Sequence, residues 1–154
     1  MALKTKVIKA IHTGMVVSNL DRSIEFYRDG LGLTVSEKLR HEGQPVADLI
    51  GAKVSAVEIA FVSLPNWEIE LLQYHGSDVR KTSNLHPSDV GCMHLSIEVN
   101  SVETALARIA EAGYAPTGIV MSPQKGPRKG GKLVYTQDPD GIVIELVEMP
   151  HCAT

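Results

Sequence analysis

The amino-acid sequence predicts an α+β fold in which two repeated βαβββ modules share one domain. The prediction rests on a strand-then-helix pattern that occurs twice, a hairpin ending in Ile-Glu-Leu that occurs twice, and a polar connector between the halves. At 154 residues the chain can bury one substantial core. We therefore place a single domain over residues 1–154, with module 1 at about 8–74, the connector at about 75–91 and module 2 at about 92–149.

The first module opens with an apolar strand at residues 11–17, IHTGMVV. Ser18 and Asn19 follow, and both are residue types typical of a helix N-cap. Apolar residues at helical spacing then predict a helix that ends near Gly30. These apolar residues are Leu20, Ile24, Tyr27 and Leu31.

The rest of the first module reads as strands joined by short irregular segments. Residues 34–46 predict a strand and a loop, and residues 47–52, ADLIGA, predict a short helical turn. A hairpin over residues 57–72 turns at Pro65-Asn66 and returns through Ile-Glu-Leu.

The second module repeats this order. A strand at residues 93–99, MHLSIEV, is followed by cap-type residues Asn100 and Ser101 and by a helix that ends at Gly113. When His12 is set on His94, the two strand–helix units align without a gap. Module 2 is thus the counterpart of module 1.

The later strands of module 2 also have counterparts in module 1. Residues 117–121 predict the middle strand, and residues 133–147 predict a hairpin whose turn is Asp-Pro-Asp-Gly at 138–141. This hairpin returns through Ile-Glu-Leu, so Glu145 is equivalent to Glu70.

Charge and hydropathy narrow the classes of partner. With 15 basic and 18 acidic residues the formal net charge is −3. The chain therefore lacks the net positive charge that favours binding to nucleic acid or to an anionic membrane. The sequence holds no apolar run long enough for a signal peptide or a membrane span, so a cytoplasmic location is expected. Small molecules are therefore the expected partners.

Cys92 and Cys152 are expected to be reduced.

Four strand residues at equivalent places in the two modules are candidate metal ligands. They are His12, Glu70, His94 and Glu145. Each lies in an apolar strand, where a carboxylate is costly to bury unless it is paired or coordinated. Two imidazoles and two carboxylates suit one divalent ion, namely Zn, Ni, Co, Mn or Fe. Any one of them alone would be read as an ordinary strand histidine or a solvent-facing glutamate, but their repetition as two pairs favours a metal site.

Four stretches together resemble the vicinal-oxygen-chelate superfamily, which includes glyoxalase I, methylmalonyl-CoA epimerase, extradiol dioxygenases and bleomycin or fosfomycin resistance proteins. The stretches are HTGMVVSNLDRSIEFYRDGLGL (12–33), WEIELL (67–72), MHLSIEV (93–99) and DPDGIVIELVE (138–148). The resemblance implies a glyoxalase-like fold whose modules form a curved-sheet cleft around the metal. It also implies that the four candidate residues are its ligands, and that the protein is a homodimer.

The activity implied by the resemblance is that of a lyase or isomerase. Such an enzyme moves a proton on the carbon beside a carbonyl, through a metal-stabilised enediolate. Glu70 or Glu145 would be the catalytic base, and Glu58 is a second candidate on the preceding strand. A ligand-type carboxylate at position 70 favours this branch over the dioxygenases.

The resemblance also indicates residues that would contact the substrate. Arg128 and Lys129, in the loop 124–132, would receive an anionic group, although a solvated loop is an equal alternative. Tyr135 would line the cleft, or else belong to the core. The glyoxalase I arginine that binds glutathione corresponds here to Val16, so the resemblance leaves open whether glutathione or CoA is used.

Two other functions stay open at this stage. An Fe(II) extradiol-type dioxygenase would use a His-His-Glu triad and would leave Glu70 without a ligand role. A non-catalytic drug-binding protein of the same superfamily would need an apolar groove and no metal.

Overall fold

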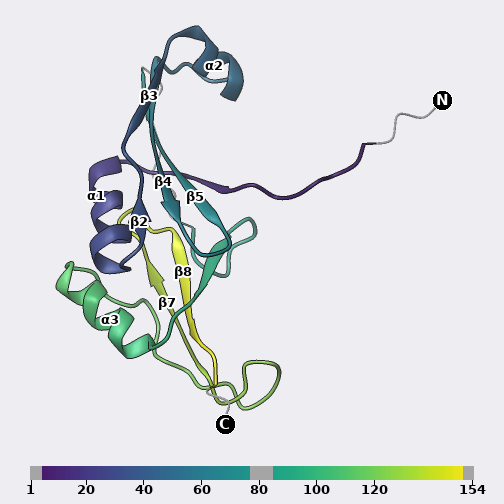
Figure 1. The fold of residues 1–154 in the computed structure, drawn as a ribbon, viewed down its shortest axis with the longest axis vertical. Coiled ribbons are helices and arrows are strands. Elements are labelled where there is room, and N and C mark those ends of the chain that lie inside the picture. The colour runs from purple at the N-terminus through teal and green to yellow at the C-terminus, as the bar shows by residue number, and fades with distance from the viewer. Residues whose placement is uncertain (1–4, 77–84, 151–154) are drawn as a thin grey trace.

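The computed structural model describes residues 5–76 and 85–150. Its strands are β1 (Thr13–Val16), β2 (Thr34–Val35), β3 (Leu39–Glu42), β4 (Ala56–Ser63), β5 (Glu68–His75), β6 (His94–Glu98), β7 (Lys132–Gln137) and β8 (Val143–Glu148). Its helices are α1 (Leu20–Glu25), which continues into the π-helical turn η1 (Phe26–Gly30), α2 (Gln44–Ile50) and α3 (Val102–Glu111). The predicted α+β fold is confirmed (Figure 1).

The strands form two sheets of the same design. The first has the order β1-β5-β4-β2, with β3 also paired to β4, and the second has the order β6-β8-β7. In each sheet the first strand of the module runs parallel to the last strand, and the last strand is antiparallel to the one before it. The two modules that repeat in the sequence therefore also have the same pattern of strand pairing.

The main core lies between the sheets and the helices. Helices α1 and α3 lie side by side against the sheets (Figure 1), and α3 packs on η1. The largest fully buried side chains come from both modules. They are Tyr27, Phe26, Leu20, Ile69, Leu71, Ile109, Ile144 and Leu146. Because strand residues alternate between faces, the residues next to these in β5 and β8 face away from α1 and α3.

The N-caps follow the predicted residue types. The Asn19 side chain accepts a hydrogen bond from Arg22 N at 3.0 Å, and Ser101 accepts one from Thr104 N at 3.2 Å. The predicted first helix is only partly α-helical, since Leu31 N donates to the carbonyl of Phe26 five residues earlier.

The middle strand predicted at 117–121 is not formed. Only isolated bridges occur there, from Pro116 to Thr136 and from Met121 to Leu133. The amides of Thr117 and Gly118 both donate to the one carbonyl of Tyr135, at 3.0 and 3.2 Å. Two consecutive amides on one acceptor break the alternation of a β ladder, so this segment stays irregular.

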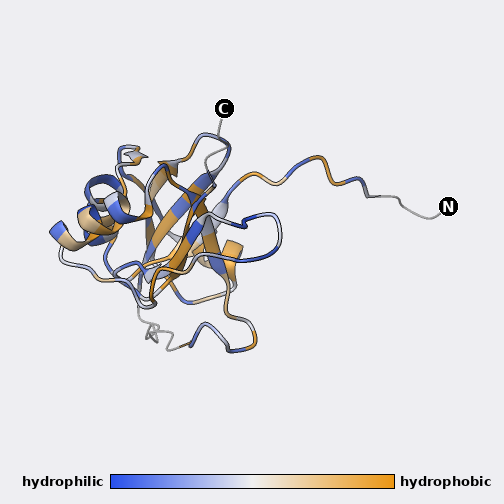
Figure 2. Cartoon of the chain, turned by 90° about the horizontal axis from the view of Figure 1, so that it is seen from below, coloured by the Kyte–Doolittle hydropathy of each residue, from blue (hydrophilic) through white to orange (hydrophobic). Residues whose placement is uncertain are grey.

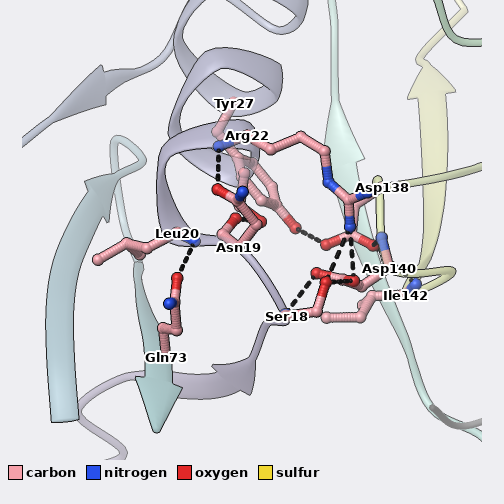
Figure 3. Close-up of polar contacts among 10 residues, drawn as sticks. Ser18, Asn19, Leu20, Arg22, Tyr27, Gln73, Asp138, Asp140 and Ile142 are labelled. Atoms are coloured by element: carbon pink, nitrogen blue, oxygen red, sulfur yellow. Dashed lines mark hydrogen bonds and ion pairs between the residues drawn. The ribbon is translucent and has the colours of Figure 1, made fainter. Parts of the chain in front are cut away.

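An aspartate of module 2 holds the start of α1 in module 1. Asp140, in the β7–β8 turn, accepts hydrogen bonds from the Ser18 amide, the Ser18 hydroxyl and the Arg22 guanidinium (Figure 3). The distance from Arg22 Nη2 to Asp140 Oδ1 is 2.8 Å. The modules are thus joined by polar contacts as well as by the core.

A second aspartate of the same turn is buried beside the first module. Asp138 Oδ1 accepts hydrogen bonds from the amides of Asp140 and Ile142 at 2.9 and 2.8 Å. The Tyr27 hydroxyl donates to Asp138 Oδ2 at 3.5 Å (Figure 3). The residue is only 4% exposed. Burial raises the pKa of Asp138 to about 6, against the opposing effect of the two amides.

Residues 5–11, which precede His12, run away from the body as an extended arm (Figures 1 and 2). Its apolar members Val7, Ile8 and Ile11 are exposed. Among the helices of the described ranges, none combines the length and apolarity that crossing a bilayer requires. Cys92 is a free thiol, as expected, whereas Cys152 and residues 77–84 of the predicted connector lie outside the described residues.

Candidate metal centre

The first candidate pair consists of His12, directly before β1, and Glu70, within β5. His12 Nε2 lies 3.2 Å from Glu70 Oε2, and the Glu70 side chain is 18% exposed. Gly14 is the cross-strand neighbour of Glu70, and a Cβ at Gly14 would lie 3.8 Å from Glu70 Oε2. The absence of a side chain there leaves space around the carboxylate.

The second pair occupies the equivalent strands of module 2. His94 Nε2 lies 3.8 Å from Glu145 Oε2, and the Glu145 side chain is only 8% exposed. Ser96 Oγ donates to Glu145 Oε2 at 2.6 Å, and Arg128 Nη1 lies 3.3 Å from both carboxylate oxygens. The Glu145 carboxylate therefore interacts with a neutral hydroxyl and with a positively charged guanidinium.

Both glutamates lie on the sheet faces opposite α1 and α3. In β5, Ile69 and Leu71 enter the helix-side core, so Glu70 between them faces the other way. In β8, Ile144 and Leu146 do the same on either side of Glu145. The repeat therefore places one imidazole and one carboxylate on the face of each sheet that points away from α1 and α3.

The donor chemistry of each pair suits a divalent metal. Ligand atoms about 2.0 to 2.2 Å from Zn²⁺ in tetrahedral geometry lie roughly 3.3 to 3.6 Å from one another. The His12–Glu70 separation of 3.2 Å is close to that spacing, and the His94–Glu145 separation of 3.8 Å is slightly longer. Small side-chain movements would let the imidazole and the carboxylate of a pair bind the same ion.

The four candidates do not meet in one cluster. Within residues 5–76 and 85–150, no three His, Cys, Asp or Glu side chains gather closely enough to hold a metal ion. The structure brings the four together only as two half-sites, and the predicted four-ligand centre stays a prediction. A cavity of about 330 Å³ separates β1 from β6, lined by Thr13–Val16 on one side and by Met93–Leu95 on the other.

Tyr135 and Arg128 lie at the second half-site. The Tyr135 ring is 5.3 Å from the His94 ring, centroid to centroid, and Tyr135 is the cross-strand partner of Glu145. Arg128 also lines a cavity of about 700 Å³ beside β6. Lys129 is exposed, and within the described residues its side chain makes no ion pair with a glutamate of either half-site.

Glu58 lies on the face of the sheet opposite to that of Glu70. Its cross-strand partner is Gln73, whereas Glu70 is paired with Phe61, so the two glutamates point to opposite faces. Glu58 instead binds His75 Nε2 at 2.7 Å. The role of Glu58 as a second base stays a prediction.

Two further features bear on the site. Val16 is 56% exposed on the face of β1 that His12 and Gly14 share, so the site face is apolar there. Ser96, which binds Glu145, was not predicted as a site residue. Its position two residues after His94 on the same strand was the available signal.

Comparisons with known proteins agree on one family. Residues 9–146 match the model of the Glyoxalase/Bleomycin resistance protein/Dioxygenase superfamily. The chain is 33% identical over 139 residues to a mitochondrial methylmalonyl-CoA epimerase of Mus musculus, covering 88% of this chain and 70% of the relative. It is 30% identical over 144 residues to a probable lactoylglutathione lyase of Synechocystis, covering 90% and 93%.

Solved structures confirm the fold. A glyoxalase family protein from Bacillus cereus superposes with a TM-score of 0.81 at 22% identity, covering 98% of this chain and all of that one. Together with the family match and the enzyme relatives, this shows that the chain belongs to the glyoxalase, bleomycin resistance protein and dioxygenase superfamily.

Proposed function

We propose that this protein is a divalent-metal-dependent lyase or isomerase that moves a proton on the carbon beside a carbonyl. The supporting observation is the pair of equivalent half-sites, each with an imidazole nitrogen within 4 Å of a poorly exposed carboxylate. Relatives named as an epimerase and as a lyase support the same reaction class. The proposed ligands are His12, Glu70, His94 and Glu145.

The donor set is compatible with Zn, Ni, Co, Mn or Fe. When bound, such an ion would polarise the substrate carbonyl and stabilise the negative charge that develops on its oxygen. The chain itself would supply two neutral imidazole donors, two carboxylates and the apolar faces around them. Those apolar faces would limit the access of water to the reacting carbon.

Of the two glutamates, Glu70 is better suited to accept and return the proton. In the described residues its carboxylate has one ionic partner, His12, whereas Glu145 is bound by Ser96, Arg128 and His94. A base must be able to gain and lose a proton without leaving several donors unpaired. We therefore assign the base to Glu70 and a fixed ligand role to Glu145.

The substrate we propose is a small molecule with an acidic C–H beside a carbonyl, such as a hydroxyacyl thioester. Tyr135 lies where it would contact a molecule bound at His94. With Val16 at the exposed position on β1, the site face has no cation there for a glutathione carboxylate. A thioester carried by another group is therefore favoured over glutathione.

We further propose that a homodimer completes the centre, with the half-site of one chain meeting the other half-site of its partner. The separation of the two pairs within one chain supports this, as do the exposed apolar residues of the arm next to His12. Mixing His12→Ala and His94→Ala chains tests it. A shared centre predicts that the mixture regains metal at up to one site per heterodimer, and a centre within one chain predicts no recovery.

Exchange of the substrate α-proton with deuterated solvent tests the proposed activity. Metal-loaded protein should exchange deuterium into a hydroxyacyl thioester, and Glu70→Gln should slow this exchange by roughly 10² to 10⁴, the usual contribution of general base catalysis. Glu68→Gln is the matched control, because Glu68 is on the same strand and face and makes no ion pair with residues 5–76 or 85–150. Oxygen uptake with catechols and Fe(II), without any exchange, would contradict the proposal.

A further inference from the structure

Arg128 makes the two half-sites unequal. Its Nη1 atom lies 3.3 Å from both oxygens of Glu145, the least exposed of the four proposed ligands. In the described part of module 1 no arginine or lysine lies in ion-pair contact with Glu70, the equivalent residue. The second half-site thus contains the guanidinium of Arg128, whereas the described part of the first half-site contains no arginine or lysine.

The backbone around Arg128 holds this cation in place. The Arg128 carbonyl accepts the amide of Gly131 at 3.1 Å, and Gly130 N donates to the carbonyl of Pro123 at 3.0 Å. Gly131 is packed so closely that a Cβ there would lie 2.3 Å from the Glu148 carbonyl oxygen. The loop is therefore fixed against β8, and β8 also carries Glu145.

The guanidinium and a metal ion would need the same two oxygens. A buried carboxylate without a counter-ion is unfavourable, and Arg128 removes that cost in the metal-free chain. A divalent ion on Glu145 would face a guanidinium a few ångströms away, and two cations at that distance repel. Arg128 therefore has to move away from the carboxylate before Glu145 can serve as a ligand.

We propose that Arg128 is an internal counter-ion of Glu145 that competes with the metal and lowers the affinity of the centre for it. Ser96 acts in the opposite direction, because its neutral hydroxyl can go on donating to a carboxylate that binds a metal and keeps it oriented. The inference rests on the proposed metal-dependent function and adds a residue that sets how tightly the metal is held.

Metal affinity, measured by competition with a chromophoric chelator for Zn²⁺ and Co²⁺, tests this proposal. Arg128→Gln should bind each ion about tenfold more tightly, which is the effect of losing one competing charge-assisted contact. Ser96→Ala should bind more weakly. Lys129→Gln is the matched control, because it removes the same charge from the next, exposed residue and should leave the affinity unchanged. An Arg128→Gln affinity equal to that of Lys129→Gln, or weaker than wild type, would overturn the proposal.

Unfolding of the metal-free protein in a chelator separates this inference from the proposed function. Arg128→Gln should lower the unfolding midpoint relative to Lys129→Gln, because Glu145 then loses its counter-ion. If the wild-type chain binds no metal and Arg128→Gln does, the competition is upheld. If both variants unfold alike without metal, the counter-ion role fails even where the wild type binds one ion. If neither chain binds metal, the competition is overturned along with the proposed metal-dependent function.

Discussion

Gln73 and Glu148 make the same hydrogen bond in the two halves of the chain. The Gln73 side-chain oxygen accepts from the amide of Leu20, where α1 begins (Figure 3), and the Glu148 carboxylate accepts from the amide of Val102, where α3 begins, at 2.9 Å. Each lies three residues after its proposed ligand glutamate, and therefore on the opposite face of the strand. In each module, Ile-Glu-Leu and the two residues after it therefore supply a proposed metal ligand and the side-chain acceptor at the start of a helix.

Removal of this acceptor should destabilise the fold. Glu148→Ala leaves the buried amide of Val102 without a partner, and we expect a loss of about 1 to 2 kcal/mol in the free energy of unfolding. Glu148→Gln keeps an oxygen in place, as module 1 does with Gln73, and should lose clearly less. Urea unfolding measures both variants. Equal losses would show that the charge of Glu148 matters more than its role as acceptor.

Asp138 should make stability depend on pH between about 4 and 6. Burial raises the pKa of Asp138 from 3.8 to about 6, so the folded state binds this proton more tightly than the unfolded state. Stability conferred by the protonated form is complete below pH 4 and is lost as the pH rises through 6. The loss amounts to about 3 kcal/mol at most.

Asp138→Asn isolates this contribution, because an amide oxygen can still accept the amides of Asp140 and Ile142. The free energy of unfolding of the variant, minus that of the wild type, should rise between pH 4 and pH 7. A difference that stays flat over this range would contradict the assignment.

The contact between Asp140 and α1 should contribute to the docking of the modules. Asp140→Ala removes three hydrogen bonds, including the ion pair to Arg22, and we expect a loss of about 1 to 3 kcal/mol. Asp21→Ala is the control, since Asp21 pairs with Lys38 on the surface and such pairs contribute about 0 to 1 kcal/mol. Comparable losses for both would mean that Asp140 acts as an ordinary surface charge.

Gly131 should tolerate no side chain. A Cβ at Gly131 would collide with the backbone carbonyl of Glu148, and overpacking of this kind costs about 1 to 3 kcal/mol. Gly118→Ala is the matched control, because the nearest atom to its new Cβ would be 4.0 Å away. Thermal unfolding of the two variants compares them directly. A Gly131→Ala protein as stable as Gly118→Ala would show that the loop 124–132 shifts freely.

The repeat and the faces of the strands could be predicted because they depend on local periodicity. A two-residue period places Glu70 opposite Ile69 and Leu71 whatever the rest of the chain does. The helix N-caps are local in the same way. These features were therefore visible in the sequence, and the structure confirms them.

Features that depend on long-range packing could not be predicted. The side on which Glu58 lies follows from the register of β4 against β5, which the turn at 64–67 determines. The separation of the two half-sites depends on how the two modules pack, where α3 contacts η1 and Asp140 binds Arg22. The contact of Arg128 with Glu145 depends on the path of a loop without periodicity. Each needs the three-dimensional arrangement of segments distant in sequence.

Metal stoichiometry tests the central claim most directly. Wild-type protein titrated with Zn²⁺ should bind one ion per chain with high affinity, and His12→Ala and His94→Ala, each from a different half-site, should both lose that binding when tested separately. Full binding by both variants, or binding that depends on one half-site alone, would contradict a centre built from both.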